Sequence, residues 1–149
     1  SIGLSTFVIS IFVLLMWIPL KQKPGMGTIL NAFIIALTIE FSVFYLPYPE
    51  TYPVQILQVV VGVLIIGIGS GFYLIANLGA GPRDGLMIGL QKKTNLHIYS
   101  IRTIIEVSVV IVGWLMGGVV GLGTAIFAFG IGPSVALGLS MVGKASKTI

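Results

Sequence analysis

Residues Leu78 to Glu106, with the sequence LGAGPRDGLMIGLQKKTNLHIYSIRTIIE, combine charges of both signs, a glycine-proline turn and the single histidine of this 149-residue chain. Strongly apolar segments flank this stretch on both sides. Apolar residues make up 56% of the chain and charged residues only 8%, against about 25% charged residues in soluble domains. The composition therefore predicts one all-α domain, residues 1–149, built as a polytopic bundle of transmembrane helices with the lipid bilayer as its solvent.

Five apolar segments are long enough to cross a membrane as helices. The first, Ile2 to Leu20, carries no charge, and Trp17 near its end suits the membrane interface. The ten residues from Asp84 to Lys93 are too few to span, so they either lie along the interface or enter the protein as a half-helix. The other four predicted spans are Thr28 to Leu46, Val54 to Asn77, Ser100 to Met116 and Leu122 to Val142.

Glycine and proline mark the predicted contacts and turns of these helices. Gly67 and Gly71 lie four residues apart in the third span, so we expect a neighbouring helix to approach closely there. Pro82 suits the first position of the short helix, with Gly79 and Gly81 forming the turn before it.

The basic residues fall on one side of the membrane when the five spans alternate in direction. The positive-inside rule makes that side cytoplasmic, so we expect a multi-pass protein of the cell (inner) membrane with a cytoplasmic C-terminus. This topology explains the net charge of +4 without nucleic-acid binding. The eight bases are Lys21, Lys23, Arg83, Lys92, Lys93, Arg102, Lys144 and Lys147.

A sequence repeat relates the two ends of the chain. Residues 25–35 (GMGTILNAFII) align with residues 121–131 (GLGTAIFAFGI) at an offset of 96, with six identities in eleven positions. A repeat of three spans has an odd number of crossings, so its second copy must be inverted in the membrane. We therefore expect two inverted three-helix repeats, residues 1–46 and 54–143. On this count the first repeat lacks its opening helix and its glycine-proline loop, and a complete protein has six spans.

Several motifs, in this order, resemble the YitT/YczE group of bacterial integral membrane proteins. The residues that carry the likeness are the loop from Leu78 to Leu86, the Arg102 to Glu106 turn with Gly113-Trp114-Leu115, and Gly121-Leu-Gly-Thr124 leading to Phe129-Gly-Ile-Gly-Pro133. In that group the loop more often reads Gly-x-x-Pro-Trp-Asp, whereas Arg83 replaces the aromatic residue here. The group is largely uncharacterised, so the resemblance implies a membrane location and transport but no substrate.

Ionisable side chains inside predicted spans are costly in lipid and mark candidate sites. Arg102 and Glu106 are one turn apart, so they can form an ion pair that either takes part in function or anchors its helix at the membrane edge. Glu40 lies about 18 Å along the helix from Thr28, which places it past the midplane of the bilayer. Its carboxyl group either carries a proton during transport or fills a polar packing position.

The loop at residues 79–85 has two interpretations. Asp84 either complements the dipole at the start of the short helix or joins Arg83 and the loop backbone in a binding element. Thr28 and its repeat equivalent Thr124 either bond back to their own helices or act in gating. The candidates for substrate binding or coupling are Glu40, Arg83, Asp84, Arg102, Glu106, Asn31 and Asn77. The structural or hinge candidates are Gly79, Gly81, Pro82, Gly121, Gly123, Thr124 and Pro133, where we expect a kink or a break in the last span.

The sequence offers little for catalysis. It has no cysteine and one histidine, His97, which suits an interfacial position better than a metal site. We therefore expect no enzyme activity, no metal and no cofactor.

The leading interpretation of function is a small secondary transporter or exporter of a small molecule. Alternating access would come from rocking of the two repeats about a site near their interface, with Glu40 or Glu106 exchanging protons. The alternative is a non-transporting scaffold or accessory subunit that binds another membrane protein through glycine faces. The expected partners are lipid, a small-molecule substrate with protons and a second copy of the chain, but no nucleic acid.

Overall fold

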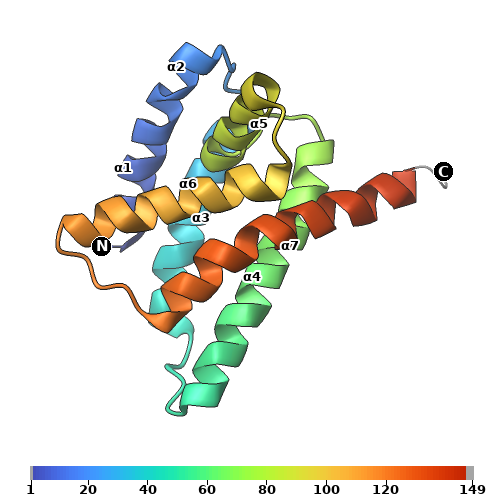
Figure 1. Cartoon of the computed structure of the whole chain (residues 1–149). Helices are drawn as coiled ribbons and strands as arrows, with labels where there is room; N and C mark the ends of the chain where they lie inside the picture. The colour runs from blue at the N-terminus through green and yellow to red at the C-terminus, as the bar shows by residue number, and fades with distance from the viewer. Residues whose placement is uncertain (1, 147–149) are drawn as a thin grey trace. The chain divides into compact units, whose positions relative to one another are not determined.

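A computed structural model describes the backbone of residues 2–146 and the side chains up to residue 143. Lys147 and the side chain of Lys144, both counted among the bases above, lie outside this description. All regular secondary structure in the described part is helical. The helices are α1 (Ile2–Leu15), α2 (Trp17–Leu20), α3 (Met26–Tyr45), α4 (Tyr52–Ile75), α5 (Pro82–Thr94), α6 (Ile98–Leu115) and α7 (Leu122–Ser146), as Figure 1 shows.

Four helices are long and apolar enough to cross a membrane: α3, α4, α6 and the first 22 residues of α7. They correspond to four of the five predicted spans. The segment predicted as the first span is instead divided into α1, of 14 residues, and the four-residue α2. Pro19 explains the division, because proline lacks the N–H group that would bond to the carbonyl of Leu15 and continue α1.

The helices form two compact units, and each is described here by itself. The first contains residues 1–48 and 76–95, with α1, α2, α3 and α5. The second contains residues 49–75 and 96–149, with α4, α6 and α7. By their contacts, residues 76–95 therefore belong to the same unit as the N-terminal helices. The predicted inverted repeat is a statement about sequence similarity and about orientation in the membrane. Neither the helix bounds nor the helix contacts test it, so it stays a prediction.

In the second unit, α4 and α7 cross at small residues (Figure 1). Gly67 of α4 lies against Ser134 of α7, and Gly71 lies against the backbone of Gly138. A side chain on either α4 glycine would overlap α7. The close approach predicted from the spacing of Gly67 and Gly71 is therefore confirmed, and two small residues four positions apart on α7 complete the contact.

Proline 133 does not break α7, which runs without interruption from Leu122 to Ser146. The predicted break is therefore wrong. Proline removes one backbone hydrogen bond from a helix, but the helix around it is held by packing, because Ile131 and Val135 are fully buried.

One helix crossing in each unit falls at positions related by the 96-residue offset. In the first unit, Gly3 of α1 lies against the carbonyl oxygen of Ala36 in α3, 2.5 Å from where its Cβ would be. In the second unit, Gly132 of α7 lies in the same way against the carbonyl oxygen of Tyr99 in α6, also at 2.5 Å. Gly3 corresponds to Tyr99, and Ala36 corresponds to Gly132. The repeat found in the sequence thus has a counterpart in helix packing.

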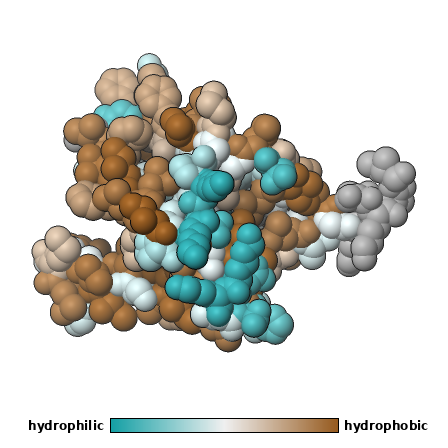
Figure 2. All heavy atoms as spheres, turned by 90° about the horizontal axis from the view of Figure 1, so that it is seen from above, coloured by the Kyte–Doolittle hydropathy of each residue, from teal (hydrophilic) through white to brown (hydrophobic). Residues whose placement is uncertain are grey.

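Large apolar side chains remain exposed on many of the helices. Phe44, Tyr45 and Leu115 are examples, each more than 70% exposed. Figure 2 shows hydrophobic side chains, in brown, over most of the face that it draws. Exposed apolar area of this extent is typical of helices that face lipid rather than water.

The α4 and α7 crossing yields the first prediction. Replacing Gly71 with Leu should destabilise the protein by about 1–3 kcal/mol or more, because overpacking a tight contact forces backbone shifts. Thermal unfolding in detergent measures the effect. The matched control is Gly69→Leu in the same helix, where nothing lies within 4 Å of the added carbon. Equal unfolding temperatures for the two variants would contradict the crossing.

Candidate functional site

The loop before α5 is held by three residues at the start of α3, which we call the first Gly-x-Gly-Thr motif: Gly25, Gly27 and Thr28. The Gly27 N–H donates a hydrogen bond of 2.8 Å to the carbonyl oxygen of Leu78. The Thr28 hydroxyl donates one of 2.6 Å to the carbonyl oxygen of Ala80 and accepts one of 3.1 Å from the Gly25 N–H. Thr28 therefore bonds mainly across to the loop, rather than back to its own helix.

The motif needs glycine because the two backbones nearly touch. A Cβ on Gly25 or Gly27 would lie 2.7 or 2.8 Å from the Leu78 oxygen. On the loop side, Gly79 has φ of +115°, a conformation that other residues rarely adopt. The contact thus requires small residues on both segments.

Trp17 holds the start of α5 from a second direction. Its side chain is only 3% exposed, and its indole Nε1 donates a hydrogen bond of 2.8 Å to the carbonyl oxygen of Pro82. The indole ring lies against Gly85, where a Cβ would collide with it. Trp17 is therefore a buried packing residue within the first unit, and its predicted position at the membrane interface stays a prediction.

Helix α5 begins as predicted, with Gly81 as its N-cap and Pro82 as its first residue. Asp84 lies in the first turn and is buried, so its carboxylate is placed where the helix dipole stabilises a negative charge. Arg83 is half-buried beside it. The structure thus brings Arg83 and Asp84 together with the glycine turn in the first unit.

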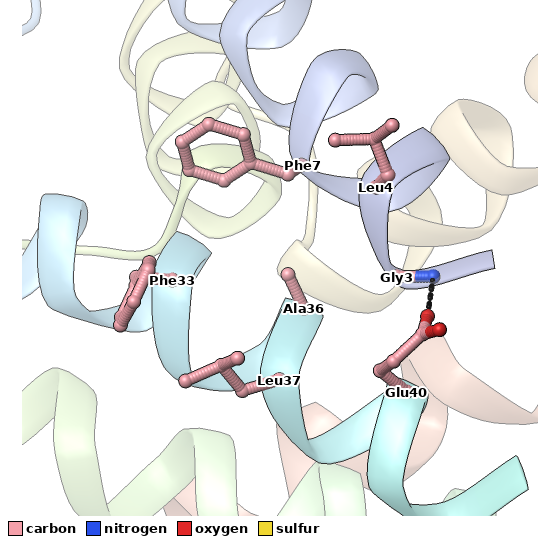
Figure 3. Close-up of a pocket in the computed structure, with 7 residues that line it drawn as sticks. All are labelled: Gly3, Leu4, Phe7, Phe33, Ala36, Leu37 and Glu40. Carbon is pink, nitrogen blue, oxygen red and sulfur yellow. Dashed lines mark hydrogen bonds between the residues drawn. The ribbon is translucent and has the colours of Figure 1, made fainter. Parts of the chain in front are cut away.

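A hollow between α1 and α3 in the first unit has a volume of about 320 Å³. Its wall is almost wholly apolar and ends in one carboxyl group, as Figure 3 shows. The lining residues are Gly3, Leu4 and Phe7 of α1 and Phe33, Ala36, Leu37 and Glu40 of α3. We call it the α1–α3 pocket.

Glu40 faces this pocket and contacts α1. Its Oε2 atom accepts a hydrogen bond of 3.0 Å from the backbone N–H of Gly3. Glu40 lies two turns after Phe33 on α3, so both residues share the pocket face of the helix. The spacing of Phe33, Ala36, Leu37 and Glu40 carried this signal, but of these four residues only Glu40 was predicted as a site residue.

Arg102 and Glu106 form the ion pair predicted from their spacing. The Arg102 Nη2 and Glu106 Oε1 atoms are 3.1 Å apart, and the two side chains are only 6% and 4% exposed. Both residues lie on α6, in the second unit. Because both side chains are buried, removing one charge of the pair would leave the other without compensation, at a large cost in free energy. The pair therefore stabilises the protein, whether or not it also takes part in function.

The other candidate residues make none of the hydrogen bonds or ion pairs described above. Asn31 is half-buried in α3, and Asn77 is exposed in the turn after α4, with φ of +54°. The repeat-related Gly121, Gly123 and Thr124 lie at the start of α7, in the second unit. His97 is exposed at the N-cap of α6. Among the described residues, no group of three or more His, Cys, Asp or Glu side chains could hold a metal ion.

Comparisons with known proteins show that the chain is similar to a family of membrane proteins. Residues 1–139 match the family of unknown function DUF6198. The chain is 43% identical to an uncharacterized protein of Haemophilus influenzae, over 97% of its own length and 66% of the relative. It is 39% identical to the uncharacterized membrane protein YczE of Bacillus subtilis, over 72% of its own length and 50% of the relative. No solved structure matches.

These matches confirm the resemblance to YczE-type proteins and the membrane location expected from the composition. The chain spans about two thirds of one relative and half of the other.

The first Gly-x-Gly-Thr motif gives the second prediction. Thr28→Val should destabilise the protein by about 1–3 kcal/mol, because it removes two part-buried hydrogen bonds, those with the Ala80 carbonyl and the Gly25 N–H, each worth about 0.5–1.5 kcal/mol. Limited proteolysis at the loop and thermal unfolding both report the loss. The control is Thr38→Val in the same helix, whose hydroxyl bonds only to the Ile34 carbonyl within the helix. A Thr28→Val protein as stable as this control would refute the role of the motif.

The ion pair gives the third prediction. Glu106→Gln should cost about 3–5 kcal/mol, because it leaves a buried guanidinium without its carboxylate. The double substitution of Arg102 by Met and Glu106 by Leu should recover most of that stability, since apolar residues of similar volume replace the pair. Equilibrium unfolding measures the free energy of unfolding of the unchanged protein, of Glu106→Gln and of the double variant. A double variant less stable than Glu106→Gln would contradict the prediction.

Proposed function

The chain belongs to the family of unknown function DUF6198. From this premise we propose that it is a small membrane transporter that exports an organic cation with apolar groups in exchange for a proton. The observation that carries the proposal is the α1–α3 pocket, with its single carboxyl group in an apolar wall. The pocket volume, about 320 Å³, lies at the lower end of the range of small-molecule sites, about 300–1,000 Å³.

The lining of the pocket selects the chemical class of substrate. Apolar side chains such as Leu4, Phe7 and Phe33 offer no ligands to a hydrated inorganic ion, but they favour an organic group. The aromatic rings of Phe7 and Phe33 also attract a cation through their faces. Glu40 supplies the one negative charge, so an organic amine or quaternary ammonium compound fits the pocket best.

The carboxyl group of Glu40 in the apolar wall also couples the movement of the substrate to the movement of a proton. In such a place a carboxylate needs either a proton or a cation to balance its charge. The substrate therefore binds as the proton leaves Glu40, and a proton returns as the substrate leaves. One positive charge moves in each direction per cycle, so the exchange is electroneutral.

The proposal includes a membrane arrangement. We propose that α1 and α2 together form a fifth span and that the sequence repeats are inverted. The repeat-related helix crossings at Gly3 and Gly132 support the repeat. The one-sided distribution of the bases supports an inner-membrane location with a cytoplasmic C-terminus. Alternating access then requires the pocket to open first to one side of the membrane and then to the other. The proposed transport involves no catalytic step.

A second candidate function is a scaffold or accessory subunit for another membrane protein. The observation that favours it is a set of helix glycines with nothing within 4 Å of an added Cβ, namely Gly62, Gly69, Gly113 and Gly143. Small residues on a free helix face allow another transmembrane helix to approach closely. A partner or a second copy of the chain that remains bound through purification, without any flux, would favour this function over transport.

Transport gives the fourth prediction. Purified protein in liposomes that enclose a pH-sensitive dye should exchange benzyltrimethylammonium, an organic cation with an apolar ring, for protons, whereas the anion benzenesulfonate should give no signal. Glu40→Gln should abolish the exchange, because the amide can neither carry the proton nor balance the cation. Glu50→Gln, in the loop between α3 and α4, is the matched control and should transport normally. Unchanged exchange by Glu40→Gln would overturn the proposed mechanism.

A further inference from the structure

The start of α7 repeats the sequence that binds the loop in the first unit. Gly121, Gly123 and Thr124, here called the second Gly-x-Gly-Thr motif, correspond to Gly25, Gly27 and Thr28 at the offset of 96. The local backbone is also alike in the two copies. The Ile29 N–H bonds to the Gly25 carbonyl at 3.4 Å, and the equivalent Ala125 N–H bonds to the Gly121 carbonyl at 3.2 Å.

The two motifs differ in what covers them. Thr28 is fully buried, with the loop carbonyl of Ala80 on its hydroxyl. Thr124 is half-exposed, and the structure gives its hydroxyl no hydrogen bond within the described residues. Among the residues that the structure describes, Gly121 has nothing within 4 Å of an added Cβ, and Gly123 has only a side-chain methyl of Val59, at 3.5 Å.

The tryptophans that precede the two motifs in the sequence show the same contrast. Trp17, which covers the start of α5 in the first unit, is 3% exposed. The second unit has Trp114 one residue after the position equivalent to Trp17, and it is 64% exposed. The second unit thus repeats the small residues and has a tryptophan near the equivalent position, but both are more exposed than their counterparts in the first unit.

We propose that the second Gly-x-Gly-Thr motif binds a second glycine-proline loop, carried by a segment of the same protein outside residues 1–149. The inference is independent of transport. The occupant is defined by the first motif, which packs against an irregular, glycine-containing backbone and donates hydrogen bonds to two carbonyls, those of Leu78 and Ala80. In the same way, the Gly123 N–H and the Thr124 hydroxyl would donate to two carbonyls of the second loop.

Two considerations favour this occupant over a second copy of the chain. The loop at residues 78–81 of any copy is already bound to its own first motif, so another copy has no free loop of this kind to offer. The curated relatives are longer, since the chain spans 66% of one and 50% of the other. These relatives therefore contain chain beyond the part that matches residues 1–149.

Photo-crosslinking in the full-length protein, in its native membrane, tests the proposal. Leu122 lies between the two glycines of the second motif and is replaced by p-benzoylphenylalanine. Mass spectrometry of the irradiated protein should find residue 122 joined to a glycine- and proline-containing peptide of the same chain from outside residues 1–149. Crosslinks only to lipid, to a second copy or to residues within 1–149 would overturn the proposal. The same reagent at Met26, the equivalent position in the first motif, controls for the reach of the probe.

A second measurement covers a loss of folding caused by the bulky probe. In the full-length protein, Thr124→Val should lower the unfolding temperature as Thr28→Val does, because both remove a hydroxyl donor to a loop carbonyl. Thr124→Ser keeps the donor and should behave as the wild type. If Thr124→Val unfolds at the wild-type temperature, the motif has no bound loop and the inference is wrong.

Discussion

The constraint on which the structure depends is that irregular backbone among apolar helices must find partners for its polar groups. Water supplies them in a soluble protein, but lipid cannot. Residues 78–81 leave helical conformation between α4 and α5, and the carbonyls of Leu78 and Ala80 are bonded by the Gly27 N–H and the Thr28 hydroxyl, respectively. The Gly27 N–H belongs to the first turn of α3, where backbone donors have no partner within the helix. One contact therefore satisfies both a helix start and a loop.

Glycine allows close contacts of this kind at several places in the chain. At Gly25 and Gly27 it admits a loop backbone, at Gly85 it admits the ring of Trp17, and at Gly67 and Gly71 it admits helix α7. In lipid there is little hydrophobic gain from bringing helices together, so close van der Waals packing and hydrogen bonds must hold them. The same packing fixes α1 against α3 at Gly3, and that crossing sets the position of the α1–α3 pocket and of Glu40.

Much of the fold could be predicted because spans and turns leave strong local signals. Long apolar runs identified four helices that qualify as spans, Pro82 marked the start of α5, and the four-residue spacing predicted the Arg102 and Glu106 pair. The division at Met16 was missed because an apolar run looks the same whether one helix or two short helices form it. The partner of Thr28 was missed because it lies 52 residues away. No local pattern distinguishes a threonine that bonds across to a loop from one that bonds within its helix.

The central claim is that the loop before α5 is held by the start of α3, and the amide hydrogen of Gly27 tests it most directly. Amide hydrogen exchange of the protein in lipid nanodiscs measures how often that N–H group is open. The account predicts that the Gly27 amide exchanges as slowly as amides in the middle of α3, because it is bonded to the Leu78 carbonyl. Exchange as fast as that of the exposed amides at Tyr48 and Glu50 would contradict it.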